Sequence, residues 1–131
     1  MTLDDVQACL EHDGWPVEPL SDSSLRSRFR RGEHAFPLLV HVEDEHVTFA
    51  IIPFARLPEE PDDAGPLVVR LLRLNREINM AKFSVDDEGD VVLSVEYRLA
   101  SLDPSEVRDA VDVLSFYADK HAAEIGRLAS A

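Results

Sequence analysis

The sequence has little cysteine, little glycine and no long apolar run, and each shortage argues against a class of protein. Its one cysteine, Cys9, cannot form an internal disulfide, which favours a reducing compartment. Five glycines leave little material for loops that hold phosphates, and no phosphate-loop, dinucleotide or zinc-knuckle motif is present. No apolar run approaches the ~20 residues that a membrane-spanning helix needs. We therefore expect no cofactor and no membrane association.

Positive charge is also scarce. The 13 lysines and arginines are outnumbered by 26 acidic residues, which gives a formal net charge of -13. A surface this acidic repels nucleic-acid phosphates and anionic membranes, so we expect neither as a partner. The chain starts MTLDDV, which is acidic where a secretion signal would be basic. Together with the lone cysteine, this start predicts a cytoplasmic protein.

The length and the apolar content indicate a single domain over residues 1–131. The chain has 131 residues, 45% of them hydrophobic, which is enough for one ordinary domain with its own core. The longest loop, RLPEEPDDAGP at residues 56–66, is too short to separate two domains.

The stretch KFSVDDEGDVVLSVEY, residues 82–97, looks most like a metal site because acidic residues surround one glycine. A calcium loop with glycine at its sixth position requires a bidentate glutamate at its twelfth. With Gly89 at the sixth position the twelfth is Val95, and Glu96 misses by one. The calcium interpretation fails at its most demanding ligand.

The same stretch fits a β-hairpin well. If residues 87–89 form a three-residue loop, Gly89 supplies the left-handed backbone that such a loop needs. Val85 then faces Val91 and Phe83 faces Leu93, so one face of the hairpin is apolar. A slip of one residue would expose that whole set to water. We therefore predict a turn rather than a metal site.

Three more strands are predicted before the middle of the chain, after a short extended piece at residues 17–20. LRSRFRR, FPLLVHVE and HVTFAIIPF alternate between apolar and polar residues, and two-residue turns at 32–33 and 44–45 separate them. In these registers one face of the sheet is apolar. That inner face comprises Leu25, Phe29, Phe36, Leu38, Val40, Val42, Val47, Phe49 and Ile51.

Three helices complete the predicted fold. The first lies between Thr2 and Gly14, the second opens at Pro66 and stops at Asn79, and the third begins after the cap Asp103. The order is α-β-β-β-α-β-β-α, with tight hairpins joining most strands. This order predicts an α+β domain in which an antiparallel sheet carries its helices mainly on one face.

The second and third helices carry more apolar surface than one contact face needs. We therefore predict a homodimer that buries the excess. The predicted dimer-interface residues are Val68, Leu71, Leu72, Val113, Phe116 and Tyr117.

The outer face of the sheet mixes arginine heads with bare apolar groups. Such a mixture is typical of protein interfaces. In the alternative, Glu43 and other acids pair the arginines, whose stems only cover the apolar groups. The predicted partner-binding residues are Arg26, Arg28, Arg30, Leu39, Ile52 and Phe54.

Few residues suggest chemistry. His41, Glu43 and His46 share the outer face and could bind iron or zinc, although nothing evident supports them as ligands. Cys9 with His12 is a conceivable thiolate–histidine pair, but a cysteine on a helix is more often simply buried.

Two further sets of polar residues suggest no catalytic role. The serines at 21, 23 and 24 are expected in a loop with no histidine near them. Asn75 lies on the apolar side of the second helix, where we expect a hydrogen bond to a neighbouring backbone rather than a ligand role.

Residues 71–114 resemble the second half of the YbjN family of bacterial sensory-transduction regulators. The matching features are the LLRLN helix, the KFSVDDEGDVVLSVEY hairpin and the LDPSEVRDAVDVL helix start, which together cover about a third of the chain. The resemblance implies the type III secretion chaperone-like fold, whose members are typically small, acidic and dimeric and bind protein segments without catalysis. The arginines of the outer face lie outside the matching stretch.

Two hypotheses follow. In the first, the chain is a non-enzymatic homodimer that binds a partner protein or peptide, as a chaperone or a regulator does. In the second, it is a small metal-binding sensor or enzyme that uses His41, Glu43 and His46.

Overall fold

The computed structural model describes residues 1–130, which fold into one antiparallel sheet and three α-helices. The strands pair in the order β1-β2-β3-β4-β6-β5. The elements are α1 (Leu3–His12), β1 (Val17–Ser21), β2 (Ser24–Arg31), β3 (His34–Glu43), β4 (His46–Arg56), α2 (Pro61–Glu77), β5 (Lys82–Val85), β6 (Asp90–Arg98), the 3-10 helix η1 (Leu99–Ser101) and α3 (Pro104–Ala129).

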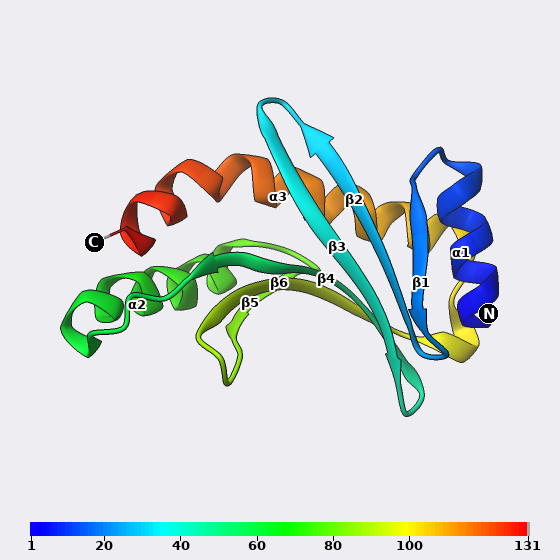
Figure 1. The fold of residues 1–131 in the computed structure, drawn as a ribbon, viewed down its shortest axis with the longest axis horizontal. Coiled ribbons are helices and arrows are strands. Elements are labelled where there is room, and N and C mark those ends of the chain that lie inside the picture. Colours follow the sequence, from blue (N-terminus) through cyan, green and yellow to red (C-terminus); the bar gives the residue numbers. More distant parts are fainter. Residues whose placement is uncertain (131) are drawn as a thin grey trace.

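The helices cover one face of the sheet, as the sequence predicts. Figure 1 shows α3 passing behind β2 and β3, with α1 beside β1 at one end and α2 beside β5 at the other. α3 packs on β4, β2, β6 and β3, and both other helices contact it. The opposite face, toward the viewer in Figure 1, carries none of the helices of residues 1–130. None of the helices in residues 1–130 has the length and the apolar content to cross a membrane.

The core lies between the sheet and α3. Phe49 and Ile51 of β4 are fully buried, and their partners Val95 and Leu93 on β6 are buried beside them. On α3, Val107, Leu114 and other apolar residues at helical spacing are buried as well. Every residue of the predicted inner face is buried except Val42, which is half-buried.

The three predicted hairpin registers are confirmed. Arg31 pairs with His34, Glu43 pairs with His46, and Val85 pairs with Val91. In the acidic turn, one carboxylate oxygen of Asp86 accepts hydrogen bonds from the backbone N–H groups of Glu88 and Asp90, both at 2.9 Å. Gly89 has a φ of 83°, so the acidic cluster is a turn.

Two boundaries differ from the sequence prediction. The extended piece at residue 17 is a full strand, β1, so the sheet has six strands where five were expected. Helix α2 starts at Pro61 rather than at Pro66, since Asp62 and Asp63 favour the positive end of the helix dipole. The left-handed residue after α2 is Met80, with a φ of 66°, and not Asn79.

Candidate functional site

The outer face of the sheet brings the predicted arginines together. Arg26 pairs with Leu39 of β3, Arg28 with Pro37 and Arg30 with Ala35. The row continues from Leu39 to Ala50 of β4, then to β6 and to Lys82 at the far edge. The three arginines are exposed, while Leu39 and Ile52 are half-buried. Five of the six predicted partner-binding residues therefore share this face.

The sequence pattern placed Phe54 on the outer face, but this ring packs on the inner side. Between Ile51 and Ala55 the register shifts. Ile51 pairs with Leu93 and Ala55 pairs with Val91, so β4 has two more residues than β6 in this interval. The two extra residues interrupt the alternation between Ile51 and Ala55, and Phe54 lies within this interrupted segment. Phe54 stacks on Phe36, with ring centroids 5.9 Å apart, and meets the edge of Phe83 at 5.6 Å. Both partner rings belong to the buried core.

Among residues 1–130, two of the three arginines have no acidic partner. The guanidinium of Arg26 donates to the carboxylate of Glu18 at 2.6 Å. Arg28 and Arg30 make no ion pair or side-chain hydrogen bond within residues 1–130, and Glu43 makes none with them. The alternative in which acids pair with the arginines of β2 therefore holds for Arg26 alone.

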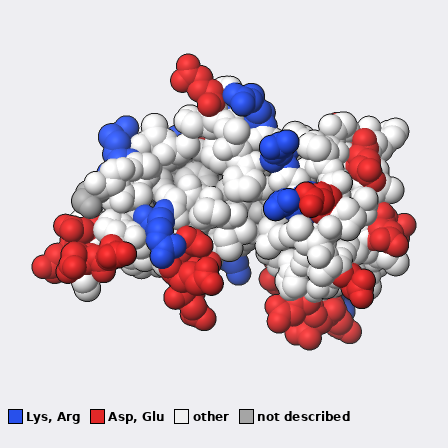
Figure 2. Space-filling view, in the orientation of Figure 1, with Lys and Arg blue, Asp and Glu red and all other residues white. Residues whose placement is uncertain are grey.

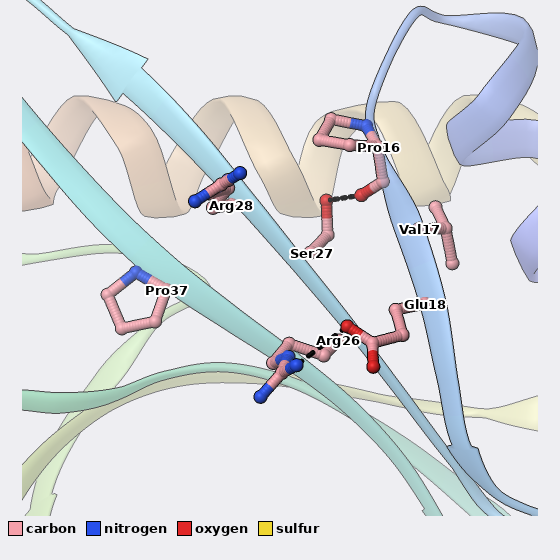
Figure 3. Close-up of a pocket in the computed structure, with 7 residues that line it drawn as sticks. All are labelled: Pro16, Val17, Glu18, Arg26, Ser27, Arg28 and Pro37. Atoms are coloured by element: carbon pink, nitrogen blue, oxygen red, sulfur yellow. Dashed lines mark hydrogen bonds and ion pairs between the residues drawn. The ribbon is translucent and has the colours of Figure 1, made fainter.

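A shallow depression of about 420 Å³ lies beside Arg28. Figure 3 shows it between β1 and β2, where the paired part of β1 begins at Val17 and the chain before it turns away toward α1. On its floor the hydroxyl of Ser27 donates to the carbonyl of Pro16. Sequence reasoning missed this hollow, because it depends on where one strand stops pairing. Its lining residues are Pro16, Val17, Glu18, Arg26, Ser27, Arg28 and Pro37.

Charge is unevenly distributed on the molecule. Figure 2 shows the face of Figure 1 as a largely uncharged surface with scattered basic groups, while most acidic groups gather along its margins. Because the net charge is -13, an arginine stripe with only one close acid is a local exception. Arg28 and Arg30, which make no ion pair within residues 1–130, can therefore attract an anionic group.

The predicted dimer-interface residues do not form one patch. Leu71 is buried in the core, and Val68, Val113 and Tyr117 are half-buried. Leu72 is 66% exposed and Phe116 is 47% exposed, each on a different helix. The hydroxyl of Tyr117 accepts a hydrogen bond from the backbone N–H of Asn79, which places Tyr117 at the junction of α3 with the end of α2.

Leu72 points away from α3. Arg70 faces α3, because its guanidinium binds the carboxylate of Glu124 at 2.9 Å. Two residues along a helix rotate the side chain by ~200°, so Leu72 lies nearly opposite Arg70. Val69, which is 47% exposed and which the sequence analysis did not single out, is the adjacent apolar residue on α2. Leu72 and Val69 therefore form a separate apolar site from Phe116.

The metal-site alternative finds no support in the geometry. Within residues 1–130 no group of three His, Cys, Asp or Glu side chains is close enough to share a metal ion, so His41, Glu43 and His46 do not assemble a site. The ring of His41 instead bonds the hydroxyl of Ser24 through Nδ1 at 2.7 Å. That contact also corrects the expectation that Ser24 has no histidine near it, since Ser24 lies on β2 opposite His41.

The thiol of Cys9 is poorly suited to nucleophilic chemistry. Burial, with Asp13 and Asp5 nearby, raises the pKa of the Cys9 thiol. A raised pKa disfavours the thiolate, which is the reactive form. His12 and Arg108 lie in the same depression as Cys9, but no hydrogen bond joins the thiol to a base in the part of the chain that is described.

The expectation for Asn75 is confirmed. Its side-chain amide donates to the carbonyl of Phe83 at 2.9 Å, and its carbonyl oxygen accepts from the N–H of Phe83 at 2.6 Å. Asn75 therefore joins α2 to the edge strand β5.

Comparison with known proteins connects this arrangement to one family and one fold. The model of the YbjN family, described as "putative bacterial sensory transduction regulator", matches residues 2–127. Among solved structures, YbjN from E. coli aligns at 15% identity with a TM-score of 0.67, covering 95% of this chain and 93% of that one. No curated protein matches the chain.

Two further structures come from protein complexes. A chain of the heterodimeric ExoU–SpcU complex from the type III secretion system of Pseudomonas aeruginosa aligns at 19% identity with a TM-score of 0.62, covering 93% of this chain and 95% of that one. A chain of the ExsC–ExsE complex aligns at 16% identity with a TM-score of 0.65, covering 96% and 98%. These alignments show the type III secretion chaperone-like fold that the sequence resemblance implied.

Proposed function

The chain belongs to the YbjN family, and from this premise we propose that it is a non-catalytic module that binds a partner protein or peptide on the outer face of its sheet. The similar solved structures include chains from two protein complexes, which supports a binding role of the chaperone or regulator kind. The lone cysteine supports a cytoplasmic location for this module.

One observation carries the proposal. In residues 1–130 no helix covers the outer face, and this face carries Arg28 and Arg30, which make no ion pair, on the same side of the sheet as the half-buried Leu39 and Ile52. Arginine with neighbouring aliphatic groups is a composition that favours protein interfaces, because the stem buries apolar area while the head forms hydrogen bonds. Within residues 1–130 no three His, Cys, Asp or Glu side chains come together, which favours the binding proposal over the metal-binding alternative.

Affinity purification from the native cells tests this proposal. We expect the double variant Arg28→Glu with Ile52→Ser to retain about thirtyfold less partner than the wild type, because loss of an interface hot spot costs about 2 kcal/mol of binding free energy. Its melting temperature should stay within about 3 °C of the wild type, since neither side chain is fully buried.

The matched control is Arg73→Glu on α2, which makes the same charge change at an exposed position behind the sheet. It should retain the wild-type amount of partner. Equal losses in the control and in the double variant would show that total charge, and not the outer face, governs capture.

We also propose that the protein forms a homodimer through Val69 and Leu72. Exposed leucine and valine neighbours on one helix favour burial against a second copy, and a stable dimer buries about 800 Å² per subunit. Light scattering at micromolar concentration should give twice the chain mass of 14.7 kDa, and Leu72→Asp should return the single-chain mass. A wild type that is monomeric at that concentration would contradict this proposal.

A further inference from the structure

We propose that the outer face takes an extended acidic segment, with carboxylates at alternate positions that bind Arg28 and Arg30. This inference rests on the proposed binding function and names the chemistry of the partner. It depends on three features of the face: its local charge, the spacing of its arginines and the hollow beside Arg28.

The part of this face formed by β2 is basic, although the protein as a whole is acidic. Three arginines project from β2, and Glu18 forms an ion pair with Arg26 alone. Arg28 and Arg30 make no ion pair in the described residues, 1–130, of a protein whose formal net charge is -13. An arginine fork binds a carboxylate with two parallel hydrogen bonds, so each free guanidinium can accept one acidic side chain.

The spacing of the two arginines selects an extended partner. Arg28 and Arg30 are two residues apart on one strand and point to the same side. A strand rises ~3.3 Å per residue, so their attachment points are about 6.6 Å apart. An extended peptide has the same repeat, and its alternate side chains also point to one side. Two glutamates separated by one residue therefore match the two guanidinium groups.

The hollow beside Arg28 can bind an uncharged side chain that lies next to the glutamates in the partner segment. Pro16 and Pro37 present apolar rings in it, and its volume of about 420 Å³ accommodates a side chain of moderate size. An acidic segment with an apolar residue next to its glutamates would use the arginines and the hollow together.

A peptide fits this face better than a nucleic acid does. Single-stranded nucleic acids bind through aromatic groups that stack on bases. The outward-facing positions of β1 to β6 carry no phenylalanine, tyrosine or tryptophan, because the bulge in β4 turns Phe54 inward. The remaining surface also repels phosphates at long range.

Fluorescence anisotropy with labelled synthetic peptides, each about ten residues long, tests the inference. Three peptides share one composition apart from two positions: glutamates separated by one residue, glutamates adjacent, and glutamines in place of both. We expect the separated pair to bind about tenfold tighter than the glutamine peptide and about threefold tighter than the adjacent pair, since each added ion pair gives up to about 1 kcal/mol. Raising the salt from about 50 to about 200 mM should weaken the binding.

The protein variants make the test specific to the arginines. Arg28→Ala with Arg30→Ala should lose about tenfold in affinity for the separated pair. Arg73→Ala with Arg76→Ala, which removes the same charge from the exposed side of α2, should leave that affinity within about twofold of wild type. Thermal unfolding of each variant confirms that the fold is intact.

The outcomes separate this inference from the proposed function. Equal binding of the glutamate and glutamine peptides, or tighter binding of a single-stranded DNA oligonucleotide, overturns the acidic-peptide inference. If Arg28→Glu with Ile52→Ser still loses its partner in cells, the proposed binding face is retained and only the acidic chemistry of the partner is contradicted. If that variant retains its partner, the proposed function fails as well.

Discussion

Asn75→Ala is expected to lower the free energy of unfolding by about 2–4 kcal/mol. The side chain of Asn75 pairs with both the N–H and the carbonyl of Phe83, which point away from β6 on the edge strand β5. Alanine leaves both backbone groups without a partner in a place where Phe83 is only 4% exposed. An unsatisfied buried group costs about 1–3 kcal/mol, and two groups are affected.

Thermal unfolding measures this effect, which corresponds to a decrease of roughly 10 °C in the melting temperature for a domain of this size. The matched control is Asn79→Ala, which makes the same chemical change just after α2. Asn79 is exposed and uses its backbone N–H, not its side chain, to bind Tyr117, so its loss should change the melting temperature little. Equal decreases for the two variants would show that the amide of Asn75 does not anchor β5.

Phe54→Ala is expected to cost about 2–3 kcal/mol of stability. Phe54 stacks on Phe36 and meets the edge of Phe83, so its loss opens space beside two buried rings. Replacing a fully buried phenylalanine with alanine lowers the free energy of unfolding by about 3–5 kcal/mol. Because Phe54 is half-buried, we expect about half to two thirds of that cost. Urea unfolding of the purified protein measures the change.

The control for this prediction is the variant Ile52→Ser. Ile52 lies two residues before Phe54 and faces outward, so this variant should lose about 1 kcal/mol or less but should weaken partner capture. If instead Phe54→Ala left stability unchanged and reduced capture, Phe54 would belong to the outer face, and the bulge would not have turned it inward.

Much of the fold could be predicted because local signals agreed with each other. The three hairpins each joined an alternating apolar pattern to a turn of suitable length, and a register error would have exposed the core. The caps at Thr2 and Asp103 marked two helix starts correctly. The role of Asn75 followed from one polar residue on an apolar helix face.

The errors arose where the local signal was ambiguous. In IIPFA of β4, every residue is apolar, so alternation could not reveal the two extra residues of the bulge, although Pro53 is a residue that ladders rarely accept. Pro61 and Pro66 are both acceptable at the first position of a helix, and only the helix dipole with Asp62 and Asp63 distinguishes them.

The candidate site was predicted only in part. Alternation placed Arg26, Arg28 and Arg30 on one face, because strand geometry alone determines which side they take. The hollow at Pro16 and Pro37 depends on where β1 stops pairing with β2, which no local pattern encodes. Within residues 1–130, Arg28 and Arg30 lack acidic partners because of where the fold places the acids of other elements, and this too is not encoded by a local pattern.

Site-specific photocrosslinking in the native cells tests the central claim most directly. A photoreactive phenylalanine analogue in place of Arg30, an exposed residue on the outer face, is compared with the same analogue in place of Phe116, an exposed residue on α3. The account predicts a covalent adduct with a partner protein from position 30 and none with that partner from position 116. An adduct formed only from position 116 would show that the partner binds the helical side, and would contradict the account.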